Sequence, residues 1–259
     1  MIKPGEGKPV ITPEEWVKGW GRDLGAEYDA AVLTFWGSPL ELLEESLRNA
    51  CEVKLRGIPI VRAIGGEEGG LRVLAAQTYF GAPAAVVTLE LLIASGIRRF
   101  LVYGGAGSIT RKLRIGDVLI PTWGVREEGA SHHYVPEGHV PKPSQSLARR
   151  LREALFSTLT PHGSRVMEGG VWSTDAIFME TEDKVRKYAD EGVLGVDMES
   201  TALMTVAEYR GVELAIALII TDELMPPEWR VPSKEDWKRI EGVERAILNA
   251  MINSLRSVA

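Results

Sequence analysis

Two carboxylates in one stretch of the chain, Glu199 and Asp222, each follow a predicted apolar strand, a sequence context typical of catalytic or ligand-binding acids. The stretch runs from Val193 to Leu224. It reads as a short apolar strand, a turn that carries Glu199, a helix, and a second strand that ends at Asp222. Ligands in open α/β sheets bind at the carboxyl ends of the strands. We therefore predict that the two acids lie at the ends of neighbouring strands and line one pocket.

The composition fits one large globular α/β domain. The chain has 259 residues, of which 45% are hydrophobic and 25% are charged, enough to bury a sizeable core. The formal net charge of -6 argues against nucleic acid or an anionic membrane as the main partner. A single cysteine, Cys51, forbids an internal disulfide, and there is neither a leader-like nor a membrane-length apolar run. We expect a soluble, cytoplasmic protein.

Strands and helices alternate along the chain, which predicts a single α/β domain with a central mixed β-sheet flanked by helices. Residues 1–30 are rich in Gly, Pro, Lys and Glu and should form an N-terminal arm before a domain over residues 31–259. Helix-capping residues precede three predicted helices, at Thr12, Thr181 and Ser233. Besides the stretch above, the predicted strands cover residues 31–36, 53–64, 71–77, 100–103, 117–120 and 165–172, and further helices cover 40–48, 82–95 and 144–159.

Two glycine-rich segments follow predicted strands. Residues 65–70 lack the lysine and the following helix of a phosphate-binding P-loop, and their turn chemistry favours a hairpin. Residues 104–108, with the sequence GGAGS, do not have the spacing of a dinucleotide-binding fingerprint. We interpret this second segment as a loop whose backbone approaches a small ligand closely.

Several motifs, taken in order along the chain, resemble those of the nucleoside phosphorylase/nucleosidase superfamily. They are two glycine loops, a Gly-x-Pro helix start, segments around sugar and base, a Met-Glu pair and a Thr-Asp pair. In this chain they read Gly37-Ser38-Pro39, Gly81-Ala82-Pro83-Ala84, Gly104-Gly105-Ala106-Gly107 with Gly116-Asp117, residues 129–134, residues 173–176, Met198-Glu199 and Thr221-Asp222. The resemblance covers roughly residues 30–255. It implies the family's α/β fold and cleavage of the N-glycosidic bond of a nucleoside.

The resemblance also implies a role for each acid. Glu199 would accept hydrogen bonds from the ribose hydroxyls, with Met198 packed on the sugar, and so favour the oxocarbenium-like charge of the transition state. Asp222 would donate a proton to a purine N7, and burial at a strand end can keep such a carboxyl protonated. Judged on sequence context alone, the two acids are equally well explained as caps of a helix and of a loop.

Other positions are carried over from the family in the same way. Phe178, which follows Ile177, is the best candidate to stack on the base, although aromatic residues at strand ends more often pack in cores or interfaces. Gly37, Gly104 and Gly105 would line the subsite for the acceptor of the sugar.

The acceptor side departs from the family pattern. Phosphorolytic members carry an arginine in each glycine loop, where this chain has Glu41 and Val102. Loss of two guanidinium groups should weaken phosphate binding by several kcal/mol, because charge-assisted bidentate bonds hold such anions. Arg56 or Arg62 is the candidate for a further arginine that reaches a neighbouring subunit. Nucleosidases of the superfamily use a glutamate near the first loop to activate water, and Glu41 either has that role or is a solvated residue in a first helical turn.

Three functions remain open at this point. The family default is phosphorolysis of a purine nucleoside, with inorganic phosphate as cosubstrate. The alternatives are hydrolysis by Glu41-activated water and a non-catalytic nucleoside-binding homologue. No cofactor is expected, and four histidines and one cysteine without a cluster make a metal site improbable. By resemblance, the protein should be a homo-oligomer, a dimer or a hexamer, with a small-molecule nucleoside as its ligand.

Overall fold

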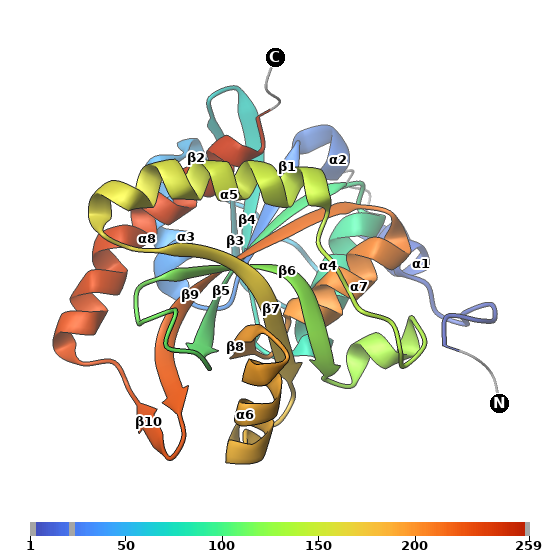
Figure 1. The fold of residues 1–259 in the computed structure, drawn as a ribbon. Helices are drawn as coiled ribbons and strands as arrows, with labels where there is room; N and C mark the ends of the chain where they lie inside the picture. Colours follow the sequence, from blue (N-terminus) through green and yellow to red (C-terminus); the bar gives the residue numbers. More distant parts are fainter. Residues whose placement is uncertain (1–3, 21–23, 257–259) are drawn as a thin grey trace.

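The computed structural model describes residues 4–20 and 24–256, so residues 1–3 and 21–23 of the predicted arm and residues 257–259 of the predicted domain lie outside it. Ten strands in the described ranges join into one mixed sheet (Figure 1). The strands are β1 Ala30–Thr34, β2 Arg48–Glu52, β3 Ile60–Glu68, β4 Leu71–Thr78, β5 Arg99–Ser108, β6 Val118–Glu127, β7 Val166–Thr174, β8 Val193–Asp197, β9 Glu213–Met225 and β10 Glu228–Arg230. The α-helices are α1 Pro13–Val17, α2 Leu24–Glu27, α3 Gly37–Ser46, α4 Ala82–Ala94, α5 Gln145–Leu159, α6 Glu182–Asp190, α7 Ser200–Arg210 and α8 Lys234–Ser254.

Half of the sheet closes on itself. The strand order is β10-β9-β6-β7-β8-β5-β1-β4-β3-β2, and an additional pairing joins β9 to β5. Strands β5, β9, β6, β7 and β8 therefore form a closed ring, and β1, β4, β3 and β2 continue from β5 as an open sheet. The fold is the predicted α/β domain with a central mixed sheet flanked by helices.

Strands β5 and β9 form the centre of the molecule. They pair in parallel from Arg99 opposite Glu213 to Ser108 opposite Glu223. The side chains from Phe100 to Tyr103, and all those from Leu214 to Ile220, are buried. Continuous apolar runs of this kind are typical of strands covered on both faces, which is why the sequence shows no alternation there.

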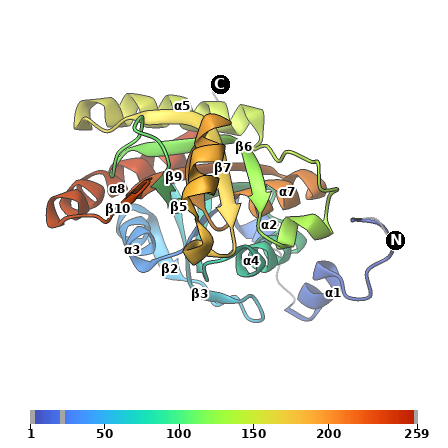
Figure 2. The same ribbon diagram turned by 60° about the horizontal axis from the view of Figure 1, so that its bottom comes forward.

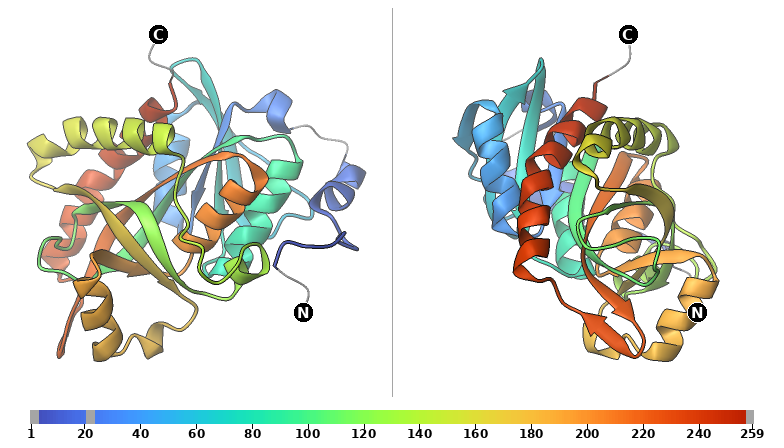
Figure 3. Two further views of the ribbon diagram at one scale, coloured as in Figure 1. Left: turned by 45° about the vertical axis from the view of Figure 1, so that its right-hand side comes forward. Right: turned by 60° about the vertical axis from the view of Figure 1, so that its left-hand side comes forward.

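The helices cover the sheet in two groups. Helix α8 packs against α3 and α5, at the left and top of Figure 1, and α4 packs against α7 on the right, beside α1 and the arm (Figures 1 and 3). In Figure 2, α6 lies in front of the ring, between β10 with α8 on one side and α7 on the other. The predicted caps are confirmed: Thr12, Thr181 and Ser233 each accept a hydrogen bond from the backbone N–H three residues further along.

The region after α3 differs from the prediction. The predicted helix over residues 40–48 ends at Ser46, and the strand predicted over 53–64 begins at Ile60. Between them, β2 is an exposed edge strand that pairs with β3, for example Cys51 with Gly65. An edge strand without a buried face carries no apolar alternation, so no hydrophobic pattern indicated it.

The two glycine-rich segments also lie in strands. Gly65 and Gly66 belong to β3, and the confirmed hairpin turns at Gly69 and Gly70, whose φ angles of 56° and 84° favour glycine. Residues 104–108, expected as a loop, continue β5 and pair with β9. Their glycines do not break the strand because the ladder on the β9 side satisfies their backbone groups.

Two further observations concern the described ranges alone. None of their helices combines the length and the apolar character that a membrane span requires. They also hold no group of three or more His, Cys, Asp or Glu side chains placed to bind a metal ion.

Candidate active site

Glu199 is buried at the point where two helices begin. It is the residue before the first turn of α7, and its relative exposure is 7%. Its Oε1 accepts a hydrogen bond from the N–H of Gly81, the residue before α4. Gly81 has a φ of 97°, a conformation that favours glycine, and Pro83 follows in the first turn of α4. The Gly-x-Pro motif and the Met-Glu pair, far apart in sequence, thus meet at one carboxylate.

Asp197 holds the turn that presents Glu199. Its carboxylate accepts hydrogen bonds from the hydroxyl of Ser173 at the end of β7 and from the hydroxyl and N–H of Ser200 at the start of α7. Ser173 Oγ in turn accepts from the N–H of Thr201 at 3.0 Å. These bonds satisfy both oxygens of Asp197, so this acid fixes β7, β8 and α7 relative to one another.

The two acids perturb each other. Burial raises the pKa of Glu199 to about 8, with a further contribution from the charge of Asp197, while the N–H groups of Gly81 and Met198 act in the opposite direction. Burial raises the pKa of Asp197 to about 6 against the donors of Ser173 and Ser200. Glu199 therefore ionises close to neutral pH, and hydroxyl groups that donate to it would favour its charged form.

Asp222 lies on the opposite side of β5 from the β8 turn. Gly107 of β5 is opposite Val196 of antiparallel β8 and opposite Asp222 of parallel β9. The prediction that the two acids follow neighbouring strands is wrong, because β5 separates β8 from β9. The carboxyl ends of both strands still converge on the carboxyl end of β5. A Cβ on Gly107 would lie 3.3 Å from Asp222 Oδ2 and only 2.3 Å from Leu224 Cδ1, so glycine permits this approach.

Three neighbours define the surroundings of Asp222. The Thr221 hydroxyl donates to Oδ1 at 2.9 Å, and the Trp229 indole N–H donates to Oδ2 at 2.8 Å. The third group is Glu180, just before α6, on which the charge of Asp222 acts electrostatically. Burial and the negative charge of Asp222 raise the pKa of Glu180 to about 7, and Lys184 opposes this rise.

Sequence reasoning missed both Glu180 and Trp229. Glu180 lies two residues after Phe178, in a segment already singled out, so its position was a usable signal. Trp229 lies in a three-residue strand paired only with β9, and nothing in its local sequence links it to Asp222.

The second glycine segment makes room for neighbouring side chains. A Cβ on Gly104 would lie 3.0 Å from Leu218 Cδ2 and 3.4 Å from the Phe35 ring. A Cβ on Gly105 would lie 3.1 Å from Thr221 Cγ2 and 3.9 Å from the Trp36 ring. Side chains of the first loop and of β9 therefore pack close to these glycines.

The first loop is surrounded by acids. Its residues Gly37 and Ser38 open α3, and Glu41 lies exposed after the first turn of that helix, which begins earlier than predicted. A Cβ on Gly37 would lie 3.9 Å from Glu41 Oε1 and 4.0 Å from Gln77 Oε1. From α8, buried Glu244 accepts hydrogen bonds from Ser38 Oγ at 2.9 Å and from the Trp36 indole at 3.3 Å. Burial raises the pKa of Glu244.

The remaining predicted positions lie further out. Phe178 and Ile177 occupy the short 3-10 turn Ile177–Met179 with relative exposures of 97% and 52%, and Met198 is half-buried. Arg62 forms an ion pair with Glu44 at 2.6 Å, and Arg56 is exposed.

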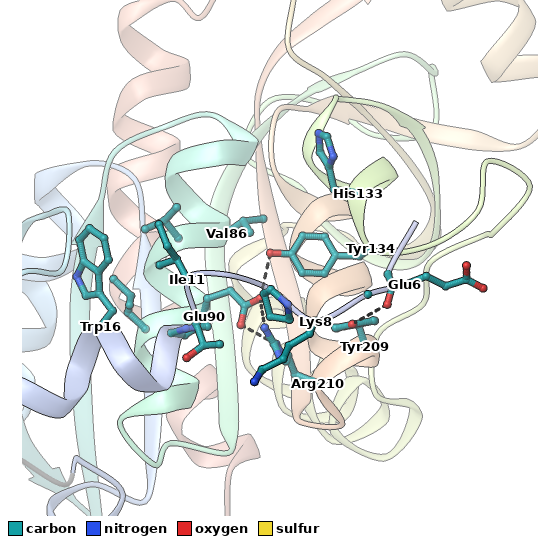
Figure 4. A pocket seen from close by; sticks show the side chains of 17 residues that line it. Glu6, Lys8, Ile11, Trp16, Val86, Glu90, His133, Tyr134, Tyr209 and Arg210 are labelled. Atoms are coloured by element: carbon teal, nitrogen blue, oxygen red, sulfur yellow. Dashed lines mark hydrogen bonds and ion pairs between the residues drawn. The ribbon is translucent and has the colours of Figure 1, made fainter. Parts of the chain in front are cut away.

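A cavity of about 680 Å³ lies elsewhere, between the N-terminal arm and helices α4 and α7 (Figure 4). In it, buried Glu90 of α4 accepts two bonds from Arg210 of α7, at 2.7 and 2.9 Å, and one from the Tyr134 hydroxyl at 3.0 Å. Both Glu90 oxygens are therefore satisfied within the chain. The ion pair joins α4 to α7 further along the same helices whose starts meet at Gly81 and Glu199.

The family model described as "Phosphorylase superfamily" matches residues 29–253. The chain belongs to this superfamily, as its motifs predicted, and purine nucleoside phosphorylases are among the proteins to which it is similar.

Similar proteins come from several bacteria. The "Purine nucleoside phosphorylase DeoD-type" of Bacillus cereus (strain ZK / E33L) is 30% identical over 164 residues, which are 63% of this chain and 68% of that protein. The protein of the same name from Bacillus thuringiensis (strain Al Hakam) is 29% identical over 164 residues, again 63% of this chain and 68% of that protein. The crystal structure of uridine phosphorylase from Vibrio fischeri ES114, complexed with 6-hydroxy-1-naphthoic acid, superposes with a TM-score of 0.75 at 22% identity, covering 87% of this chain and 90% of that chain. It has the same fold.

Proposed function

We propose that the protein cleaves the N-glycosidic bond of a purine nucleoside, with inorganic phosphate as the acceptor of the sugar. The observation that carries this proposal is the placement of Glu199, a buried carboxyl group held between the starts of α4 and α7. The family membership and the purine phosphorylases among the relatives support it.

In this reaction Glu199 acts on the sugar. Its carboxylate accepts hydrogen bonds from the ribose hydroxyls and stabilises the positive charge that develops as the bond from C1′ to N9 breaks. The buried site strengthens this interaction, because water does not screen it. An acceptor oxygen then bonds to C1′, and the base leaves with the electron pair of the broken bond.

Carboxyl groups at the far end of the site support a purine as the leaving base. Asp222 and Glu180 interact electrostatically, and Glu180 is partly protonated near neutral pH. A purine N7 accepts a proton or a strong hydrogen bond from such a carboxylic acid. A pyrimidine has no ring nitrogen in the equivalent position.

Hydrolysis is the second candidate, and the acids of the first loop favour it. Glu41 Oε1 approaches Gly37, and Glu244 binds Ser38 beneath the same loop. Negative charge at these positions opposes a phosphate dianion but not a neutral water molecule. Glu41 would then remove a proton from the attacking water.

An assay with and without phosphate separates the candidates. Purified protein is incubated with inosine, adenosine, methylthioadenosine and uridine, and free base and sugar products are measured. Phosphorolysis gives ribose 1-phosphate only when phosphate is present. Release of free ribose without phosphate contradicts phosphorolysis as the sole reaction, and binding without turnover indicates a non-catalytic homologue.

Glu41→Gln tests the water-activating role directly. If the reaction is hydrolytic, this variant should lose turnover. Glu235→Gln is the matched control, since Glu235 is also an exposed glutamate near the start of a helix, α8. Equal rates in the two variants remove Glu41 as the base.

A further inference from the structure

We propose that Glu244 of α8 determines how well the protein binds phosphate, because it holds the first loop, Gly37-Ser38-Pro39, and places a negative charge beside it. The inference rests on the proposed function, since it concerns the acceptor of the sugar in that reaction. It goes beyond that function by giving a role to a residue of the last helix, which lies in none of the family motifs.

Glu244 joins the first loop to α8 through two side chains that also bind each other. Its Oε2 accepts the Ser38 hydroxyl at 2.9 Å, and its Oε1 accepts the Trp36 indole N–H at 3.3 Å. The same indole N–H also donates to Ser38 Oγ at 3.1 Å. Glu244 has a relative exposure of 3%, whereas Ser38 is exposed. The loop therefore lies between a buried carboxyl group and solvent.

Trp36 connects this cluster to the second glycine segment. The centroids of the Trp36 and Tyr103 rings are 5.3 Å apart, and a Cβ on Gly105 would lie 3.9 Å from the Trp36 ring. Tyr103 directly precedes Gly104 in β5 and is fully buried. Burial and the charge of Glu244 raise the pKa of its hydroxyl. Glu244 therefore acts on both segments that line the acceptor subsite in the proposed reaction.

No lysine or arginine of the described ranges forms an ion pair with Glu244. Its two donors, a hydroxyl and an indole, are neutral, and the adjacent Arg245 pairs with Glu45 instead. Burial raises the pKa of Glu244 against the donors of Ser38 and Trp36. An anion at the loop raises it further, so phosphate has to overcome the repulsion of the carboxylate or drive its protonation. A neutral acceptor such as water meets neither obstacle.

The two roles of Glu244 have opposite effects on phosphate. The hydrogen bonds keep the loop in the position that the acceptor meets, which favours binding, whereas the charge opposes an anion. Glu244 thereby orders the loop and limits its affinity for phosphate relative to water. Substitutions of Glu244 and Ser38 separate the two roles, because each can remove one and keep the other.

Glu244→Gln removes the charge and keeps the loop in place. Its amide oxygen still accepts the Ser38 hydroxyl, and the Trp36 indole keeps its bond to Ser38. With inosine as substrate, KM for phosphate should fall by about fivefold or more, while KM for inosine stays within about twofold of the wild-type value. Altering a merely structural residue would not improve phosphate binding.

Ser38→Ala removes one donor and keeps the charge. The Glu244 carboxylate then has the indole alone, so KM for phosphate should rise by about threefold or more. Glu244→Leu removes both the charge and the hydrogen bonds. Its kcat should be about tenfold below that of Glu244→Gln, because the loop is no longer held in position.

Two variants control for the loss of a negative charge in general. Glu241→Gln changes an exposed glutamate three residues before Glu244 on α8, and Glu182→Gln changes one on α6 that pairs with Arg186. Both should leave KM for phosphate within about twofold of the wild-type value, since exposed charges are screened.

The possible failures are distinguishable. A wild-type protein that forms no ribose 1-phosphate refutes the proposed function and this inference with it. If the wild-type protein forms ribose 1-phosphate, an unchanged or raised KM for phosphate in Glu244→Gln overturns the inference and leaves the proposed function intact. Thermal unfolding shows whether each variant is folded. If Glu244→Gln does not fold, Ser38→Ala decides, and an unchanged or lowered KM for phosphate in it overturns the inference.

Discussion

Glu199 and Glu41 are both glutamates at the start of a helix, but their surroundings differ. Glu199 is buried and accepts the N–H of Gly81, and its turn is fixed by Asp197. Glu41 is exposed near the start of α3, beside a loop whose Ser38 donates to the carboxylate of Glu244. The proposed sugar half of the site, around Glu199, is thus preorganised by buried hydrogen bonds, whereas the proposed acceptor half, around Glu41, is open and acidic. In the proposed reaction the first half would determine the substrate class and the second half would determine the nucleophile.

Glu199→Gln should have the largest effect on activity. The amide keeps the size of the side chain but cannot stabilise the developing positive charge, so kcat/KM for inosine should fall by about 1,000-fold. Steady-state kinetics measures this, with Glu182→Gln as the control. A loss smaller than about tenfold would show that the carboxylate has no electrostatic role in the transition state.

Glu41→Arg tests whether Glu41 lies in the acceptor half of the site. It replaces a carboxylate at the first loop with a guanidinium group, which binds phosphate through charge-assisted hydrogen bonds. If phosphate is the acceptor, its KM should fall by about tenfold or more, with an unchanged KM for the nucleoside. An unchanged KM for phosphate would place Glu41 outside the acceptor subsite.

The pH dependence tests the electrostatics of the sugar half. Because the pKa of Glu199 is raised to about 8, kcat/KM should rise with pH as the free protein forms the carboxylate. Stability should change in the opposite direction: the neutral form favours the folded state, so the contribution of Glu199 is lost as pH rises through about 8. Unfolding temperatures between about pH 5 and pH 8 measure this loss, because the carboxyl is ionised in the unfolded chain but still protonated in the fold over this range, and Glu199→Gln should remove it. An equal decline in the variant would assign the effect to other groups.

The smallest effect on activity is expected from a substitution that breaks the ion pair between Glu90 and Arg210 (Figure 4). Arg210→Met leaves buried Glu90 with the Tyr134 hydroxyl alone, and should destabilise the fold by about 2 kcal/mol. KM for the nucleoside should rise only a few-fold, since α4 and α7 keep their contact at Gly81 and Glu199. Chemical denaturation measures the first effect, and Arg186→Met, in an exposed ion pair, is its control. Equal stability of the two variants would show that the ion pair between Arg210 and Glu90 does not stabilise the fold.

Local patterns predicted the strand, the turn and the helix around Glu199 well. A short apolar strand, a Met-Glu turn and a helix are contiguous in sequence, so the position of Glu199 followed from residues within a few turns of it. The apolar strand before Asp222 was equally clear. The order of the strands in the ring could not be predicted. Strand β8 pairs antiparallel with β5 through only two residue pairs, and no local pattern encodes this pairing.

The parts that sequence reasoning missed depend on long-range packing. Glu244 reaches Ser38 from the final helix, Trp229 reaches Asp222 through an exposed three-residue strand, and β2 gains its structure from β3. Hydrophobic periodicity reports which face of an element is buried, not which polar group it meets. Two of these contacts lie at the acceptor and base subsites, where the chain also departs from the family pattern or adds to it.

Phosphorus NMR of the reaction with inosine and inorganic phosphate tests the central claim most directly. We predict a ribose 1-phosphate signal that grows in step with free hypoxanthine and disappears with Glu199→Gln. Hypoxanthine release without ribose 1-phosphate, or no release at all, would contradict it.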